Sequence, residues 1–297
     1  MTPREEGFLL LTSSLGDPNR HPLTTPQLRT LAERVRTAAS DPEDREMEPR
    51  DLMAMGYGRE MAERILALLD DAVLLKHYLN RGQRADCVPL SRVSEDYPIT
   101  VHNRLGAEAP GCLWAKGNLE LLTKPAVALV GSREIGEGNL AFAREVGRQA
   151  ARQGVVLVSG NARGADRAAQ ESCLASGGEV ICVVADELER HTSRKNILYI
   201  SEDGFDLPFS SQRALSRNRV IHCMGLRTFV AQASYQRGGT WDGTVKNLRF
   251  GWSPVYCFND GSAAVSLLGE MGAEVIELCE LHDITALPVR FFGLFDQ

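Results

Sequence analysis

Short apolar runs alternate with helical patterns through the second half of the chain, and this alternation constrains the fold more than any other feature. The apolar runs are 126–130, 155–160, 179–185, 227–233, 253–258 and 274–278. Segments with helical periodicity separate several of them, at 139–154, 167–178 and 261–272. Strands separated by helices of this length imply βαβ units, parallel strands and right-handed crossovers. The pattern therefore predicts an α/β fold built on a parallel sheet.

A different pattern precedes this alternation. Thr25 is placed to cap a helix with Pro26 in its first turn, and residues 59–82 have the periodicity of one long helix that ends at Gly82. We therefore expect a Rossmann-like parallel sheet core preceded by a small helical N-terminal domain. The expected boundaries are 1–85 for the helical domain, 86–122 for a linker and lead-in strand near 111–116, and 123–297 for the core.

Composition limits the class of ligand. The formal net charge is -6 and the isoelectric point about 5.6, so a nucleic-acid surface has to be a local basic patch. The seven cysteines are scattered without zinc-site spacing, and we expect no metal and no cofactor. No apolar run approaches the ~18 residues that a membrane helix needs. We expect a cytoplasmic protein without a membrane partner.

Glycine and arginine follow the first apolar run at once, in VALVGSREIGEGN (127–139). Gly131, Ser132 and Arg133 thus lie in a strand-to-helix turn. In a parallel sheet such turns lie at the carboxyl edge, where the unpaired N–H groups of a helix start attract anions. We expect this turn to hold a phosphate.

Two further segments carry the same chemistry. SGNARGAD (159–166) follows the next strand and supplies Ser159, Gly160, Arg163, Gly164 and Asp166. SQRALSRNR (211–219) supplies Arg213, Arg217, Asn218 and Arg219. Simpler interpretations stay open, because Arg133 and Arg163 could pair with Glu134 or Asp166, and the third segment could be a solvated helix face. The glycine spacing matches neither a dinucleotide fingerprint nor a Walker loop.

In that order and spacing, VALVGSRE, SGNARGADRAAQESCLASGG and SRNRVIHCMG resemble the motifs of the DNA-processing protein A family. The lead-in that contains Tyr97 and Pro98 is also similar, and the resemblance covers roughly 90–260. It implies a non-enzymatic protein that binds single-stranded DNA through basic residues at the sheet edge, usually as a homodimer. It further implies a RecA-type recombinase as a possible partner and a role in recombination. The residues it carries over are Gly131, Ser132, Arg133, Ser159, Gly160, Arg163, Gly164, Asp166, Arg217, Asn218 and Arg219.

The chain departs from the family pattern in three places. Leu215 and Ser216 replace a proline and an arginine, and Gly238, Gly239 and Thr240 in RGGTWDGTVKN keep only the turn character of a later phosphate-binding segment. The sequence ends at ALPVRFFGLFDQ without a winged-helix segment, so we expect a short or divergent member. We expect Phe291, Phe292, Leu294 and Phe295 to pack on the core or on a partner.

Alternative functions stay open. The pocket could hold a nucleotide or another small phosphorylated ligand, and a phosphoribohydrolase-like activity is a weaker alternative. The protein could also regulate a neighbouring phage-defence effector, in the manner of an antitoxin. Single-strand binders stack bases on aromatic rings, but the aromatic residues near the expected site, Phe209, Tyr235 and Trp241, are best interpreted as core residues. His222 is also interpreted as a core or surface residue and not as a catalyst.

Overall fold

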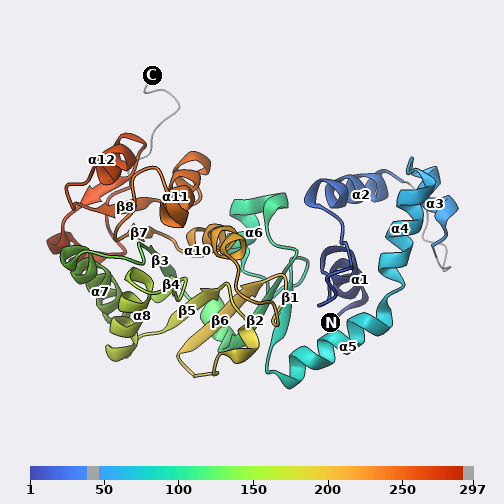
Figure 1. The fold of residues 1–297 in the computed structure, drawn as a ribbon, viewed down its shortest axis with the longest axis horizontal. Coiled ribbons are helices and arrows are strands. Elements are labelled where there is room, and N and C mark those ends of the chain that lie inside the picture. Colours follow the sequence, from blue (N-terminus) through green and yellow to red (C-terminus); the bar gives the residue numbers. More distant parts are fainter. Residues whose placement is uncertain (39–46, 290–297) are drawn as a thin grey trace.

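The computed structural model describes residues 1–38 and 47–289. A single mixed sheet runs through the molecule in the order β1-β2-β6-β5-β4-β3-β7-β8-β9 (Figure 1). In this sheet order, each strand from β6 through β3 to β9 runs parallel to its neighbours in that part of the sheet. Strand β2 pairs antiparallel with both β1 and β6. The strands are β1 (Val88–Ser91), β2 (Cys112–Gly117), β3 (Ala126–Val130), β4 (Val156–Ser159), β5 (Val180–Val184), β6 (Ile197–Glu202), β7 (Thr228–Val230), β8 (Val255–Phe258) and β9 (Glu274–Ile276).

Helices cover both faces of the parallel part, and the alternation along β3 shows why. Val127 and Leu129 pack in one apolar cluster with α7 (Glu137–Arg152) and α8 (Ala165–Ala175). Ala128 and Val130 point to the other face, because successive side chains of a strand alternate. The helices on that face are α6 (Ile99–Leu105), α10 (Asn218–Met224), α11 (Gly238–Phe250) and α12 (Ala263–Glu270). This three-layer arrangement confirms the predicted α/β class.

The N-terminal part is helical and lies beside the β1 edge of the sheet (Figure 1). Its helices are α1 (Pro3–Thr12), α2 (Thr25–Thr37), α3 (Pro49–Ala54), α4 (Arg59–Leu69) and α5 (Ala72–Arg84). Helix α5 packs on the sheet through Tyr78, whose ring centroid is 5.3 Å from Trp114 on β2 and 4.8 Å from Phe205. The Tyr78 hydroxyl donates to Asp206 Oδ1 at 2.7 Å. The helical part is thus joined to the sheet by a buried aromatic cluster.

The structure differs from the sequence-based expectation in several local features. The helix expected over 59–82 is two helices, because the chain leaves helical geometry between α4 and α5, where Asp71 has φ -75° and ψ 33°. Strands β1 and β6 and helix α1 were not expected, whereas β2 lies where the lead-in strand was expected. The residues assigned to a linker therefore contribute two strands to the sheet. The division into three ranges, 1–85, 86–122 and 123–297, stays a prediction.

Short connecting helices complete the fold. Helix α9 (Ser211–Ser216) directly precedes α10, and 3-10 turns cover Gly106–Glu108, Leu119–Thr123, Leu188–Arg190 and Leu278–Asp283. None of the helices described is long and apolar enough to cross a bilayer. The expectation for Phe291, Phe292, Leu294 and Phe295 lies outside the described residues.

Candidate functional site

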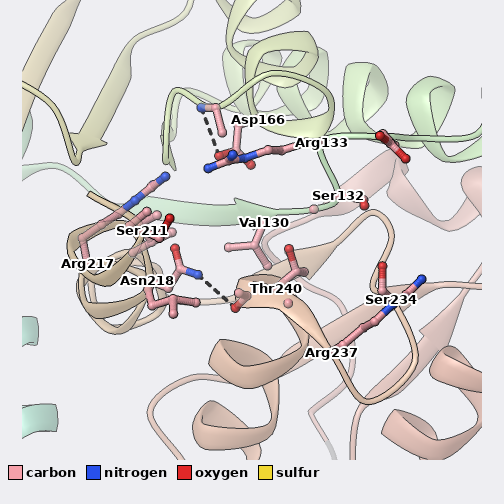
Figure 2. A pocket seen from close by; sticks show the side chains of 18 residues that line it. Val130, Ser132, Arg133, Asp166, Ser211, Arg217, Asn218, Ser234, Arg237 and Thr240 are labelled. Carbon is pink, nitrogen blue, oxygen red and sulfur yellow. Dashed lines mark hydrogen bonds between the residues drawn. The ribbon is translucent and has the colours of Figure 1, made fainter. Parts of the chain in front are cut away.

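The pocket of main interest lies where the strand order of the sheet reverses. Strands β4, β5 and β6 extend from one side of β3, and β7 continues on its other side. In open α/β sheets, ligands bind outside the carboxyl ends of the strands at such a switch point. A pocket of about 400 Å³ lies at this point. We call it the switch-point pocket. Its lining comes from the segments after β3, β4 and β7 and from α9 and α10 (Figure 2).

Glycines allow the first two loops to pack tightly against each other. A Cβ on Gly131 would collide with the Ala165 side chain at the start of α8. Gly164 has φ +84°, and a Cβ there would collide with the carbonyl oxygens of Ser132 and Arg133. The Ala165 N–H donates to the Ser132 carbonyl at 3.2 Å. The two predicted loops therefore form one wall, as expected for neighbouring strands.

The buried arginine of the pocket is Arg217, which is 6% exposed. Its guanidinium lies against Gly160, where any Cβ would displace it. Its Nε and Nη1 atoms have no hydrogen-bond partner among the described residues. Burial lowers the pKa of Arg217, while the nearby Asp166 carboxylate favours its charged form. The protein therefore compensates this positive charge only in part, which favours an anionic ligand.

Asp166 is one of two acidic residues that line the switch-point pocket, and the other is Glu134. Asp166 is 6% exposed, and its Oδ2 accepts a hydrogen bond from the Ala162 N–H at 3.4 Å. Burial raises its pKa, and the charge of Arg217 opposes that shift. These contacts make Asp166 a residue that orders the 160–166 loop beneath the pocket.

A second pocket of about 180 Å³ adjoins the first and shares Arg133, Ala162 and Arg217 with it. We call it the adjoining pocket. Gly160 and Arg163 also line it. Neither Arg133 nor Arg163 makes an ion pair with Glu134 or Asp166 within the described part of the chain. The structure thus brings three of the predicted arginines, from three different segments, to two connected pockets.

The start of α11 forms the opposite wall of the switch-point pocket. Gly238, Gly239 and Thr240 line it, and Asn218 Nδ2 donates to the Gly239 carbonyl at 2.9 Å (Figure 2). The positive end of a 13-residue helix therefore faces the pocket. Arg237, directly before α11, lines the same pocket and was missed from the sequence. The sequence did contain a signal for this residue, because Arg237 directly precedes a glycine pair at the start of a helix.

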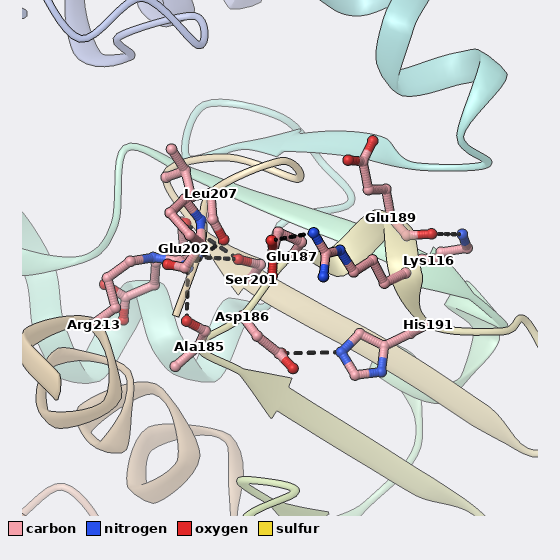
Figure 3. Close-up of polar contacts among 12 residues, drawn as sticks. Lys116, Ala185, Asp186, Glu187, Glu189, His191, Ser201, Glu202, Leu207 and Arg213 are labelled. Carbon is pink, nitrogen blue, oxygen red and sulfur yellow. Dashed lines mark hydrogen bonds and ion pairs between the residues drawn. The ribbon is translucent and has the colours of Figure 1, made fainter. Parts of the chain in front are cut away.

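Four predicted residues line neither pocket: Ser159, Gly164, Arg213 and Arg219. Arg213 lines neither pocket, and its Nη1 and Nη2 donate to the Ala185 carbonyl and the Ser201 hydroxyl, both at 2.7 Å (Figure 3). Arg219 donates to the Glu108 carbonyl and pairs with Glu202 at 3.2 Å. Ser159 is fully buried and donates to the Leu129 carbonyl at 2.9 Å. The side chains of Ser159, Arg213 and Arg219 have partners inside the protein, so we assign them to the framework of the site.

The aromatic residues do not all lie in the core. Trp241 is 8% exposed, as expected, but Phe209 is 53% and Tyr235 51% exposed, so the core interpretation of these two was wrong. Phe209 lines the adjoining pocket, and the Arg133 guanidinium carbon is 5.9 Å from its ring centroid. An exposed ring held beside an arginine is a surface on which a base can stack.

His222 is a core residue, which is one of the two environments expected for it. It is fully buried, and Asn247 Nδ2 lies 3.0 Å from its Nδ1, so the neutral ring accepts a hydrogen bond there. Burial lowers the pKa of His222 to about 3. Asn247 also contacts Ser253 Oγ at 3.0 Å, so this network joins α10 and α11 to the segment before β8.

The fold and the pocket define a doubly wound α/β protein with arginines gathered at its switch point. The profile of one family, DNA recombination-mediator protein A, matches residues 89–277. The chain belongs to that family.

Individual relatives agree with this assignment. The chain is 31% identical over 183 residues to "DNA processing protein DprA" of Streptococcus pneumoniae, an alignment that covers 57% of this chain and 61% of that protein, less than two thirds of its length. The crystal structure of DNA processing protein A from the same organism superposes with a TM-score of 0.69 and 25% identity, over 93% of this chain and 95% of that one. A structure from Helicobacter pylori, titled for the single-stranded DNA binding mode of its DNA processing protein A, shares the fold at TM-score 0.54 and 22% identity, over 64% of this chain and 90% of that one.

Proposed function

We propose that the protein binds single-stranded DNA without catalysis, with successive phosphates in the two connected pockets. Arg133, Arg163 and Arg217 are the proposed phosphate contacts, and Arg237 extends the track toward α11. The backbone N–H groups of Gly131, Ser132, Gly160, Gly238, Gly239 and Thr240 are proposed to assist.

The observation that carries the proposal is that four arginines, none of which forms an ion pair within the described residues, converge on the two pockets of a protein of net charge -6. The charged Arg217 is buried between the pockets, and exposed arginines flank it. A single ligand that spans both pockets needs negative charges repeated along its length. The phosphodiester backbone of a single strand has this property.

Family membership and the relatives support this choice. The description of the matched family names recombination mediation, and the name given to the Helicobacter pylori structure includes single-stranded DNA binding. A small phosphorylated ligand is the second candidate, because a helix N-terminus at a switch point also suits one phosphate group. Such a ligand would occupy the switch-point pocket alone.

The test is a titration of oligo(dT), duplex DNA of the same length and mononucleotides at several salt concentrations. For single strands, each phosphate contact contributes roughly 0.7 to the slope of log affinity against log salt. Arg163→Ala and Arg217→Ala should therefore weaken oligo(dT) binding and flatten that slope. Arg36→Ala, an exposed change on α2, is the control and should do neither.

The two ends of the track separate the candidates. Arg163 lines only the adjoining pocket and Arg237 only the switch-point pocket. Oligo(dT) should depend on both arginines, whereas a mononucleotide in the switch-point pocket should respond to Arg237→Ala and not to Arg163→Ala. If all these variants bind oligo(dT) within twofold of the parent at low salt, the single-strand proposal fails. Release of a free base from a mononucleotide would instead establish the hydrolase alternative.

The homodimer, the recombinase partner and regulation of a defence effector stay predictions from the resemblance. The homodimer is tested by measuring the molecular mass in solution. The partners are tested by co-purification with and without single-stranded DNA. The role of the protein in its cell follows from those partners.

A further inference from the structure

The adjoining pocket contains an acidic side chain that phosphate binding leaves unexplained. Asp186 follows β5 and lines this pocket together with Arg163 and the exposed ring of Phe209. A carboxylate next to a phosphate would oppose binding. A carboxylate next to an exposed aromatic ring, in contrast, suits a nucleobase, which offers a face for stacking and N–H donors at its edge.

The neighbours of Asp186 hold its carboxylate in a fixed position. His191 Nε2 lies 3.0 Å from Asp186 Oδ1 (Figure 3). The His191 ring stacks on Tyr199 at a centroid distance of 4.5 Å. The hydrogen bond from His191 lowers the pKa of Asp186, so the carboxylate stays ionised and accepts. The Asp186 side chain is still 46% exposed, so acceptor capacity remains for a ligand.

We propose that the side of the adjoining pocket formed by Asp186 and Phe209, next to the phosphate contact at Arg163, is a nucleobase subsite that prefers guanine, with Phe209 as the stacking surface and the Asp186 carboxylate as the acceptor for the base edge. Guanine presents two adjacent donors, N1–H and the 2-amino group, which match the two oxygens of a carboxylate. Thymine presents one donor between two carbonyl oxygens, which the carboxylate repels. Adenine and cytosine place an acceptor beside their amino group. His191 is a positioning residue for Asp186.

This inference rests on the proposed function, and the experiment separates the two. Binding of oligo(dT) is compared with the same oligonucleotide carrying isolated guanines, isolated inosines or isolated 7-deazaguanines. A bidentate base contact corresponds to roughly a tenfold preference for guanine over thymine. Inosine lacks the 2-amino group and should lose most of the preference. The 7-deaza base keeps the edge that Asp186 would contact and should retain it.

Asp186→Asn should reduce the guanine preference to within about twofold, because its amide replaces one acceptor with a donor. Glu134→Gln is the matched control, since it removes the same charge from the switch-point pocket. Both variants should bind oligo(dT) somewhat more tightly, and only Asp186→Asn should change the ratio between guanine and thymine. His191→Ala should reduce the ratio in part.

The outcomes are distinct. If oligo(dT) binds but guanine gives no advantage, the inference fails while single-strand binding stands. A preference that survives Asp186→Asn, or one that disappears with 7-deazaguanine, would assign the discrimination to another group and also overturn it. Failure of every oligonucleotide to bind would reject the proposed function itself.

Discussion

The guanidinium of Arg217 lies directly against the Cα of Gly160, so that no side chain fits between them. The glycine belongs to the loop after β4 and the arginine to the junction of α9 and α10. This contact places a buried positive charge between the two pockets. It also explains why a glycine is needed at a position where backbone conformation alone does not require one.

Gly160→Ala tests this relationship. The added methyl group would displace the end of the Arg217 side chain, which is flexible, so we expect a change in the free energy of unfolding below about 1 kcal/mol. Affinity for oligo(dT) should nevertheless fall, as it does for Arg217→Ala. Urea unfolding and a binding titration on the same preparation check both. Unchanged affinity would show that the position of Arg217 does not matter for binding.

Gly164→Ala, unlike Gly160→Ala, should clearly lower the stability of the fold. The alanine would have to adopt φ +84° and would press on two backbone carbonyls, which cannot move without opening the loop. We expect a loss of stability of about 1 to 3 kcal/mol. Thermal unfolding measures the loss. A melting temperature equal to that of Gly160→Ala would contradict this reasoning.

Arg213→Ala should destabilise the protein without changing the salt slope. Its guanidinium bonds the carbonyls of Ala185, Leu207 and Pro208 and the Ser201 hydroxyl, and the alanine would leave these acceptors unpaired. A loss of about 3 kcal/mol is expected. Denaturant unfolding measures it. A flattened salt slope in a stably folded variant would instead place Arg213 among the phosphate contacts.

Phe209→Ala should weaken binding of oligo(dT) by about 1 to 3 kcal/mol, the usual contribution of one stacked base. Tyr235→Ala is the matched control, because Tyr235 is equally exposed but lines neither pocket. Anisotropy titrations of both variants provide the comparison. Equal losses in the two variants would rule out a specific stacking site at Phe209.

Stability should fall as the pH is lowered below 6.5, because of His222. The unfolded chain takes up a proton on this histidine near pH 6.5, whereas the folded protein does so only near pH 3. Between these values the unfolded state binds more protons, so acid favours it, by at most ~1.4 kcal/mol per pH unit. Unfolding free energies at pH 7.5 and 5 measure the effect. His222→Gln should flatten the dependence, and an unchanged dependence in this variant would attribute it to other groups.

The sequence was sufficient to predict the parallel sheet and the loops of the site. Each loop directly follows an apolar strand, and the carboxyl ends of parallel strands meet at one edge, so Arg133 and Arg163 could be placed together without coordinates. The glycines of these loops were equally informative, since Gly131 and Gly164 allow the close approach that the structure shows.

The direction of the arginines in 211–219 was not predictable. Arg213 and Arg219 point to partners on or near β6, including Ser201 and Glu202. That strand was not recognised in the sequence, so these partners were unknown. Only Arg217, between them, lies at the pockets. The exposure of Phe209 likewise depends on the tertiary packing of an irregular segment that has no periodicity.

Strands β1 and β2 have a consequence for how the protein can be divided. They cover the β6 edge of the parallel sheet through the antiparallel pairing of β2. A fragment that begins at residue 123 would leave β6 with an open row of N–H and C=O groups, which is a template for edge-to-edge aggregation. Its failure to stay in solution would then report both the uncovered edge and the loss of α6 from one face of the sheet. Dissection of this protein should therefore retain both strands together with α5, whose Tyr78 covers Trp114 on β2.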